Sequence, residues 1–167
     1  STTTKAVVMD DTQAIIGRGI TNSRSNYDTA TRVAKQEAVI DARLTLVERQ
    51  LSAAPGLKDR ADDLLAGLER AFRLEQYCDR LADLEQSCID KLSGDRFAGR
   101  EAELETAVNE VFTRLRADAP EMFAPGAKRK SDFFRDIAGS QYLTAAENVA
   151  NEAKLPFDLM INLYDKS

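Results

Sequence analysis

The sequence contains no histidine, and this absence narrows the chemistry that the protein can perform. Ser-His-Asp and Cys-His nucleophile systems both need an imidazole as general base. Histidine-ligated zinc and haem sites are excluded for the same reason. Two cysteines are too few for a cysteine-rich zinc or iron–sulfur site. The phosphate-binding patterns GxxxxGK[ST] and GxGxxG are also missing from the sequence, so we expect no cofactor.

Carboxylates are the remaining candidates for a metal site or for acid–base chemistry. Glu37, Glu75 and Glu85 lie on expected helices, and Glu37 interrupts an otherwise apolar stripe. Glu37 could act as a general base or as the buried partner of an arginine. It could equally be a boundary residue that reaches water, or a polar group that sets helix register. Di-iron bundles use Glu-x-x-His, which this chain lacks. Because the residues of most catalytic systems are missing, we expect a protein that is not an enzyme.

One basic cluster is a candidate contact for a partner. Lys128, Arg129 and Lys130 follow a Pro-Gly turn and precede two phenylalanines. The cluster could bind a phosphate or an acidic partner. The alternative is a solvated loop that enters the next helix, because three cations in an acidic protein are a weak signal.

The C-terminal segment, residues 155–164, is the densest apolar stretch of the sequence. Phe157, Met160, Ile161 and Tyr164 recur at i, i+3, i+4 and i+7, the spacing of one helix face. Such a face could dock into a groove on another protein. It could also pack onto its own bundle as a closing helix.

Cys78 and Cys88 lie on one expected helix, roughly 15 Å apart along its axis. A disulfide needs Cα atoms within about 7 Å, so the two cannot pair within that helix. We expect reduced thiols, which indicate a reducing compartment. The N-terminal residues also lack the apolar region of a signal peptide. We therefore expect a cytoplasmic protein.

Four main helices are predicted from apolar periodicity. The first runs from Tyr27 to Leu51 and stops before Pro55-Gly56. The second runs from Leu57 to Leu92, and its apolar stripe changes phase near Phe72. The third covers 100–118, and the fourth covers 132–153 with Ser131 as a plausible N-cap. The first stripe comprises Ala30, Val33, Ile40, Leu44, Val47 and Leu51, widened by Ala34, Ala38 and Ala42.

The first 25 residues support two interpretations. Residues 7–9 (VVM) could begin a strand, whereas the three isoleucines that follow could equally lie on a helix. Gly17 and Gly19 weaken both alternatives. Ser25 or Asn26 could cap the helix that follows. The structure of this segment is left open.

Composition places the chain among helical proteins with a charged surface. It has 167 residues, 43% apolar and 31% charged, and a net charge of −5. An acidic balance disfavours general nucleic-acid binding, which needs clustered cations. No run of about 20 apolar residues is present, so we expect no membrane span. We expect residues 1–167 to form a single helical domain.

The predicted fold is an all-α bundle of four main helices, with a long antiparallel helical hairpin and a short C-terminal helix. The predicted function is a structural or protein-interaction role: assembly, scaffold or adaptor. Apolar helix faces would bind a partner protein or a second copy, and we expect a homo-oligomer. One alternative is an enzyme that holds an anionic substrate through Arg and Glu. The other is a sensor with a ligand pocket lined by Tyr27, Glu37, Tyr77 and Tyr142.

Overall fold

The computed structural model describes residues 3–23, 26–128, 131 and 133–165. Its contacts divide into two compact units, Ser1–Glu69 and Arg70–Ser167, here called the N-terminal and the C-terminal unit. Each unit is described by itself. A single domain for the whole chain stays a prediction.

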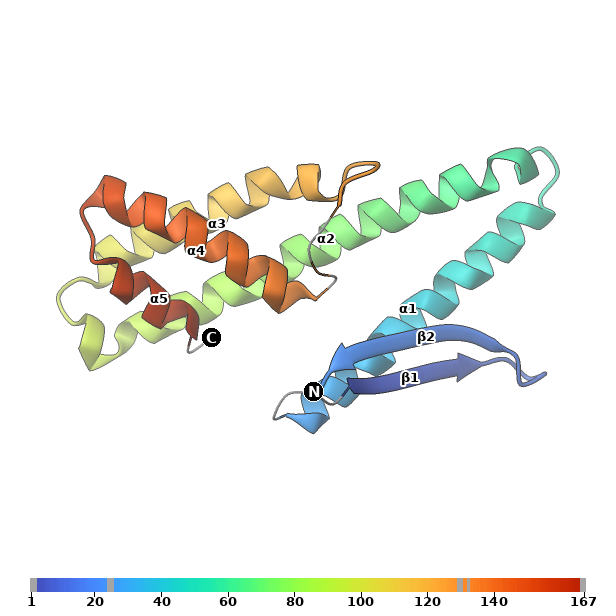
Figure 1. Ribbon diagram of the computed structural model, residues 1–167, viewed down its shortest axis with the longest axis horizontal. Helices are drawn as coiled ribbons and strands as arrows, with labels where there is room; N and C mark the ends of the chain where they lie inside the picture. The colour runs from blue at the N-terminus through green and yellow to red at the C-terminus, as the bar shows by residue number, and fades with distance from the viewer. Residues whose placement is uncertain (1–2, 24–25, 129–130, 132, 166–167) are drawn as a thin grey trace. The chain divides into compact units, whose positions relative to one another are not determined.

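The N-terminal unit begins with a β-hairpin that lies on a long helix (Figure 1). Strands β1 (Thr3–Met9) and β2 (Ile15–Asn22) pair antiparallel, and α1 (Tyr27–Ala53) follows. Exposure alternates along β1, which is the period of a strand with one covered face. The strand interpretation of residues 7–9 is therefore confirmed, and the helical alternative for the isoleucines is wrong.

The ends of α1 agree with the sequence prediction. The Asn26 side chain accepts a hydrogen bond from the Thr29 N–H at 2.9 Å, which satisfies one of the free donors at the helix start. The helix ends at Ala53, and Gly56 takes a positive φ of 82°, a conformation that suits glycine. Ser25 lies outside the described residues.

Helix α2 (Ala61–Asp90) belongs to both units, because the division falls after Glu69. Single 3-10 turns, η1 (Lys58–Arg60) and η2 (Lys91–Ser93), flank it. Leu64 and Leu68 are exposed on its first part, whereas Leu81 and Cys88 are buried on its second part. The predicted phase change thus coincides with the passage from one unit to the other.

The C-terminal unit continues with a short 3-10 turn, η3 (Asp95–Phe97), and three helices. These are α3 (Glu101–Met122), α4 (Phe134–Ala153) and α5 (Phe157–Asp165). The prediction that α3 stops before Ala119-Pro120 is wrong. Pro120 lies inside this helix and has no backbone N–H to donate. The helix nevertheless continues through the fully buried Ala119 to its end at Met122.

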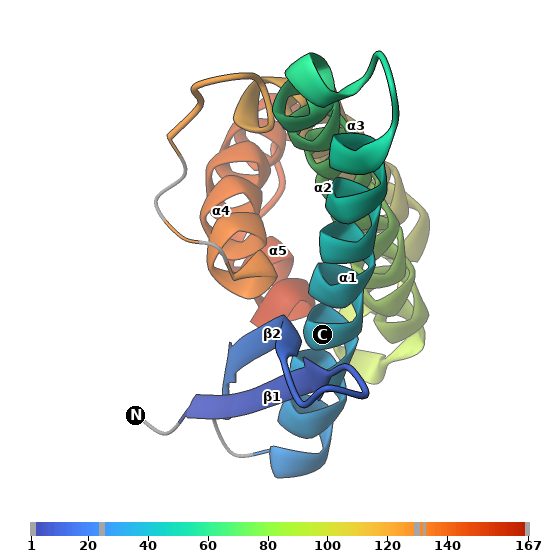
Figure 2. The same cartoon turned by 90° about the vertical axis from the view of Figure 1, so that its right-hand side faces the viewer.

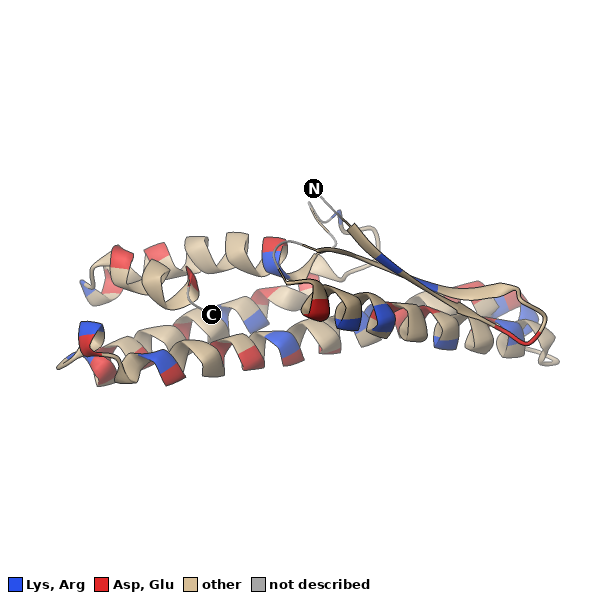
Figure 3. Cartoon of the chain, turned by 90° about the horizontal axis from the view of Figure 1, so that it is seen from below, with Lys and Arg blue, Asp and Glu red and all other residues tan. Residues whose placement is uncertain are grey.

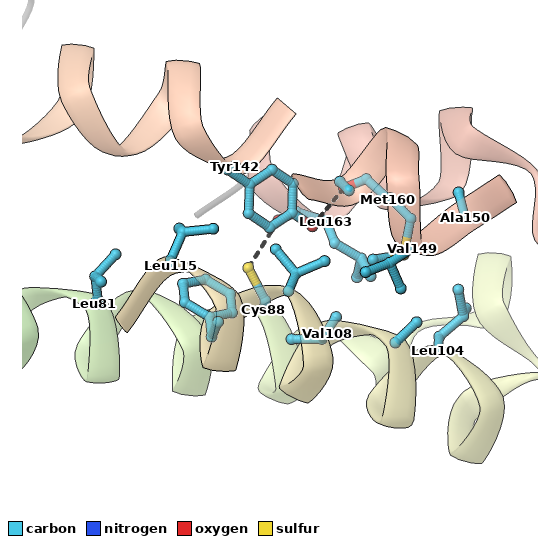
Figure 4. Packing of buried hydrophobic residues seen from close by; sticks show 14 of the residues in the cluster. Leu81, Cys88, Leu104, Val108, Leu115, Tyr142, Val149, Ala150, Met160 and Leu163 are labelled. Atoms are coloured by element: carbon cyan, nitrogen blue, oxygen red, sulfur yellow. Dashed lines mark hydrogen bonds between the residues drawn. The ribbon is translucent and has the colours of Figure 1, made fainter. Parts of the chain in front are cut away.

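The core of the C-terminal unit is formed by large apolar side chains from α2, α3, α4 and α5 (Figure 4). Phe112 and Tyr142 pack with ring centroids 5.7 Å apart, within the usual range for aromatic pairs. The largest fully buried side chains are Tyr142, Phe112, Leu81, Leu104, Met160 and Leu163.

The predicted fold class is confirmed: the chain is mostly helical, with a long helix pair and a short C-terminal helix. The small β-hairpin adds to it. Basic and acidic positions are intermixed along the helices (Figure 3). Among the described residues, no helix combines the length and apolar character that crossing a membrane requires.

Candidate functional site

The buried residues of the N-terminal unit are all small within its described part. The hairpin contacts one face of α1 (Figure 2), and the contact brings backbone against backbone. A Cβ on Gly19 would collide with the Ala34 carbonyl oxygen, and one on Gly17 would collide with that of Ala38. The buried set is Gly17, Gly19, Ser23, Ala30, Ala34, Ala38, Ala42 and Ala61.

The large apolar side chains in the described part of this unit are half-buried or exposed, and none is fully buried. Val7 and Met9 of β1 are 50% and 53% exposed, and Leu68 of α2 is 47% exposed. The stripe residues that the sequence placed at the centre of the α1 face, such as Ile40 and Leu44, are only half-buried. The exposed non-aromatic apolar side chains lie on the hairpin, on α1, on α2 and in the turn between these helices, and we call this set the apolar surface: Val7, Met9, Ile15, Ile20, Leu46, Leu57, Leu64 and Leu68.

Sequence reasoning missed the hairpin part of this surface. The available signals in the sequence were the β-branched Val7 and Val8 and the Gly-x-Gly at 17–19. We read the two glycines as weakening any regular element. Their role is instead to bring β2 against the alanines of α1, which leaves the alternate side chains on the outer face.

The hairpin turn is fixed by one carboxylate. Asp10 Oδ1 accepts hydrogen bonds from the Thr12 hydroxyl at 2.7 Å and from the Ala14 N–H at 3.0 Å. These bonds, first that of Thr12, lower the pKa of Asp10, and Arg49 of α1 contributes at a distance of 3.7 Å. The Asp10 carboxylate thus stays ionised in the hairpin turn, and its ion pair with Arg49 links the turn to α1.

The predicted contact residues of the C-terminal segment pack on their own unit. Met160 is fully buried, and Phe157 and Tyr164 pack against the core. The Tyr164 ring stacks on Tyr142 with centroids 4.8 Å apart. Ile161 is half-buried. This is the closing-helix arrangement; a role of these side chains in partner binding stays a prediction.

The other predicted contact residues lie far apart in the sequence. Glu37 is half-buried on α1, on a face next to the buried alanines. Lys128 is exposed in the loop between α3 and α4. Arg129 and Lys130 lie outside the described residues, so the structure gives no account of the basic cluster as a whole.

The four residues proposed for a ligand pocket do not belong to one unit. Tyr27 and Glu37 lie in the N-terminal unit, and Tyr77 and Tyr142 lie in the C-terminal unit. The Tyr142 hydroxyl already donates to the Met160 carbonyl oxygen at 2.9 Å (Figure 4). Neither unit therefore contains the predicted pocket.

Several carboxylates of the C-terminal unit pair with arginines. Glu85 of α2 lies 2.7 Å from Arg116 of α3. Arg114 of α3 pairs with Glu110 and with Glu152 of α4 at an open groove between these helices. The hydrogen bond from Arg114 lowers the pKa of Glu152. No three His, Cys, Asp or Glu side chains in the described ranges gather as metal ligands would.

Both cysteines are free thiols, as predicted. Cys88 is buried and directs its Sγ at the Leu163 carbonyl oxygen, 3.8 Å away. Cys78 is half-buried, and burial is the main cause that raises the pKa of its thiol. A thiol with a raised pKa is a weak nucleophile, so neither cysteine is arranged as a reactive centre.

Comparison with known proteins gives no assignment. Neither the models of protein families, nor the curated proteins, nor the solved structures include a match to this chain.

Proposed function

We propose that the protein is a non-catalytic assembly protein that self-associates through the apolar surface of its N-terminal unit. One observation carries the proposal: in its described part this unit fully buries small residues only, while its large apolar side chains are half-buried or exposed. A buried methyl group contributes about 0.8 kcal/mol, and a buried Leu or Val side chain roughly 1.5–3 kcal/mol. The side chains of the apolar surface are 37–53% exposed, so a partner that covers them adds hydrophobic free energy that the single chain does not gain.

A second copy is the partner that fits best. In a twofold contact the same patch lies on both sides, so apolar side chains meet apolar side chains without a matched partner surface. The net charge of −5 and the mixed charges along the helices disfavour nucleic acid or an anionic membrane as the partner. Because both cysteines are free, we propose that assembly takes place in the cytoplasm.

The test is the molar mass of the full chain in solution, measured by size-exclusion chromatography with light scattering over a range of concentrations. We expect a mass above that of one chain that rises with concentration. The double variant Leu64→Lys/Leu68→Lys places two charges on the apolar surface and should shift the equilibrium towards the monomer. Leu143→Lys is the matched control, because Leu143 is 43% exposed but lies on α4 of the other unit.

Two results would contradict the proposal. A clean monomer at every concentration would exclude self-association. Equal effects of the double variant and of Leu143→Lys would show that the apolar surface has no special role. Circular dichroism of each variant separates lost association from lost folding.

A further inference from the structure

The two edges of the β-hairpin differ in whether their outward-pointing backbone groups already have a hydrogen-bond partner. On β2, the backbone N–H of Arg18 donates to Asp41 Oδ2 of α1 at 2.8 Å. This N–H therefore points away from β1, towards the outer edge of β2. A carboxylate that occupies an edge donor prevents another strand from pairing there. The edge of β2 is thus closed at Arg18 by the helix on which the hairpin lies.

The edge of β1 is open. Arg18 pairs with Val7, and Ile20 pairs with Lys5. In an antiparallel pair, two facing residues either both bond to each other or both point their N–H and C=O groups outwards, and the two kinds alternate along the strand. Because the Arg18 N–H points outwards, the backbone groups of Val7 and, two residues earlier, Lys5 also point away from β2. Among the described residues, no hydrogen bond from outside the hairpin reaches the backbone of either. Val7 is also half exposed.

We infer that β1 pairs antiparallel with β1 of a second copy, so that two hairpins form one four-stranded sheet. The inference rests on the proposed function: to the contact through apolar side chains it adds pairing of the two hairpin edges. A two-stranded sheet leaves the backbone groups of its edge strands unpaired, and a four-stranded sheet pairs those of Lys5 and Val7 on β1. Because Asp41 occupies the Arg18 N–H at the middle of the β2 edge, a further copy cannot form a full ladder there, so we expect the contact to end with two copies.

The length of β1 makes the strand complementary to itself. The strand covers seven residues, Thr3–Met9, with Ala6 at its centre. In the full-length antiparallel register, Lys5 of each copy faces Val7 of the other. Both residues direct their backbone groups to the open edge, so these two pairs contribute about four hydrogen bonds.

Charge favours the same register. Lys5 is the only charged residue of β1, and like charges directly opposite each other destabilise a sheet. The full-length register places each Lys5 opposite a valine, so its methylene groups cover the Val7 side chain. A register shifted by two residues towards the N-terminus would place the two lysines opposite each other.

The test compares Val7→Pro with Val7→Thr in the full chain. Proline removes the N–H at the open edge and leaves the bonds between β1 and β2, whereas threonine keeps the N–H, the shape and the strand preference. We expect Val7→Pro to weaken association by about a hundredfold and Val7→Thr by a few-fold at most. Light scattering measures both dissociation constants.

Amide hydrogen exchange of the unmodified chain gives a second readout, which does not depend on the folding of the proline variant. The amides of Lys5 and Val7 should gain more protection as concentration rises than that of Arg18, because the Arg18 N–H is already bonded to Asp41 in a single copy. If Val7→Pro associates as tightly as the unmodified chain, or if Val7→Thr loses as much affinity as Val7→Pro, strand pairing is overturned. The proposed function, self-association, is unaffected by either result. Concentration-independent exchange at Lys5 and Val7 in an associating protein overturns it too. A monomeric unmodified chain overturns the proposed function itself.

Discussion

At the scale of single residues, two core tyrosines differ in the environment of their hydroxyl groups. Tyr142 donates to the Met160 carbonyl oxygen, whereas the buried Tyr77 hydroxyl has no hydrogen-bond partner among the described residues. We predict that Tyr142→Phe lowers the free energy of unfolding by about 1 kcal/mol. Tyr77→Phe should be neutral or slightly stabilising, because it removes an unsatisfied polar group. Urea unfolding of both variants tests this; a larger loss for Tyr77→Phe would contradict it.

The environment of Tyr77 also predicts a loss of stability at alkaline pH. Burial, and then the nearby Cys78 and Tyr164, raise the pKa of Tyr77 from the ordinary tyrosine value of 10.0 to about 12. As pH rises, the Tyr77 hydroxyl therefore loses its proton in the unfolded chain before it does so in the folded one. The stability that the protonated Tyr77 contributes is fully present below about pH 10 and is lost towards about pH 12. Tyr77→Phe should reduce the fall in unfolding free energy between about pH 9 and pH 11. An unchanged fall, in paired urea titrations, would show that Tyr77 does not ionise in this range.

Gly19 is the residue on which the hairpin contact depends. A Cβ here meets the Ala34 carbonyl oxygen, which belongs to a helix backbone and cannot move aside. We predict that Gly19→Ala costs about 1–3 kcal/mol of unfolding free energy and loosens the hairpin. Gly94→Ala is the control, because its nearest neighbour would be the Lys91 carbonyl oxygen at 3.3 Å. Comparable losses in both variants would argue against close packing of the hairpin.

At the scale of elements, α5 closes the core of the C-terminal unit. Its Leu163 carbonyl oxygen accepts from Lys91 Nζ at 3.3 Å, which satisfies one of the free acceptors at a helix end. We predict that Leu163→Ala costs about 2–5 kcal/mol, because Leu163 is fully buried. Leu143→Ala on the exposed face of α4 should change stability by about 0.5 kcal/mol or less. Thermal or urea unfolding would contradict this if both cost the same.

At the scale of the whole molecule, the two units differ in what their interiors contain. The C-terminal unit has a core of large side chains, and the N-terminal unit buries small ones. We predict that α1 amides exchange faster than α3 amides in dilute solution and gain protection as concentration rises, since association stabilises the folded state by mass action. Exchange mass spectrometry at two concentrations measures this. Equal, concentration-independent protection would contradict it.

The helices were predictable from sequence because their signals are local. The 3,4 spacing from Tyr27 to Leu51 and the Pro55-Gly56 stop fixed α1 to within two residues at its end. The choice of buried face was not local. Ala34 and Ala38 are buried because Gly17 and Gly19 bring a strand against them. The contacting pairs, Gly19 with Ala34 and Gly17 with Ala38, are 15 and 21 residues apart in the sequence.

The amino-acid sequence by itself determined the helical class, the free thiols and the chemistry that a chain without histidine cannot perform. Each of these follows from residue type or from local spacing. Only the tertiary structure decided that residues 3–22 form a hairpin, that α5 closes its own unit, and that Val7 and Leu68 stay at the surface. Burial is a property of the contact between segments, and apolar periodicity alone does not tell which segment covers a face.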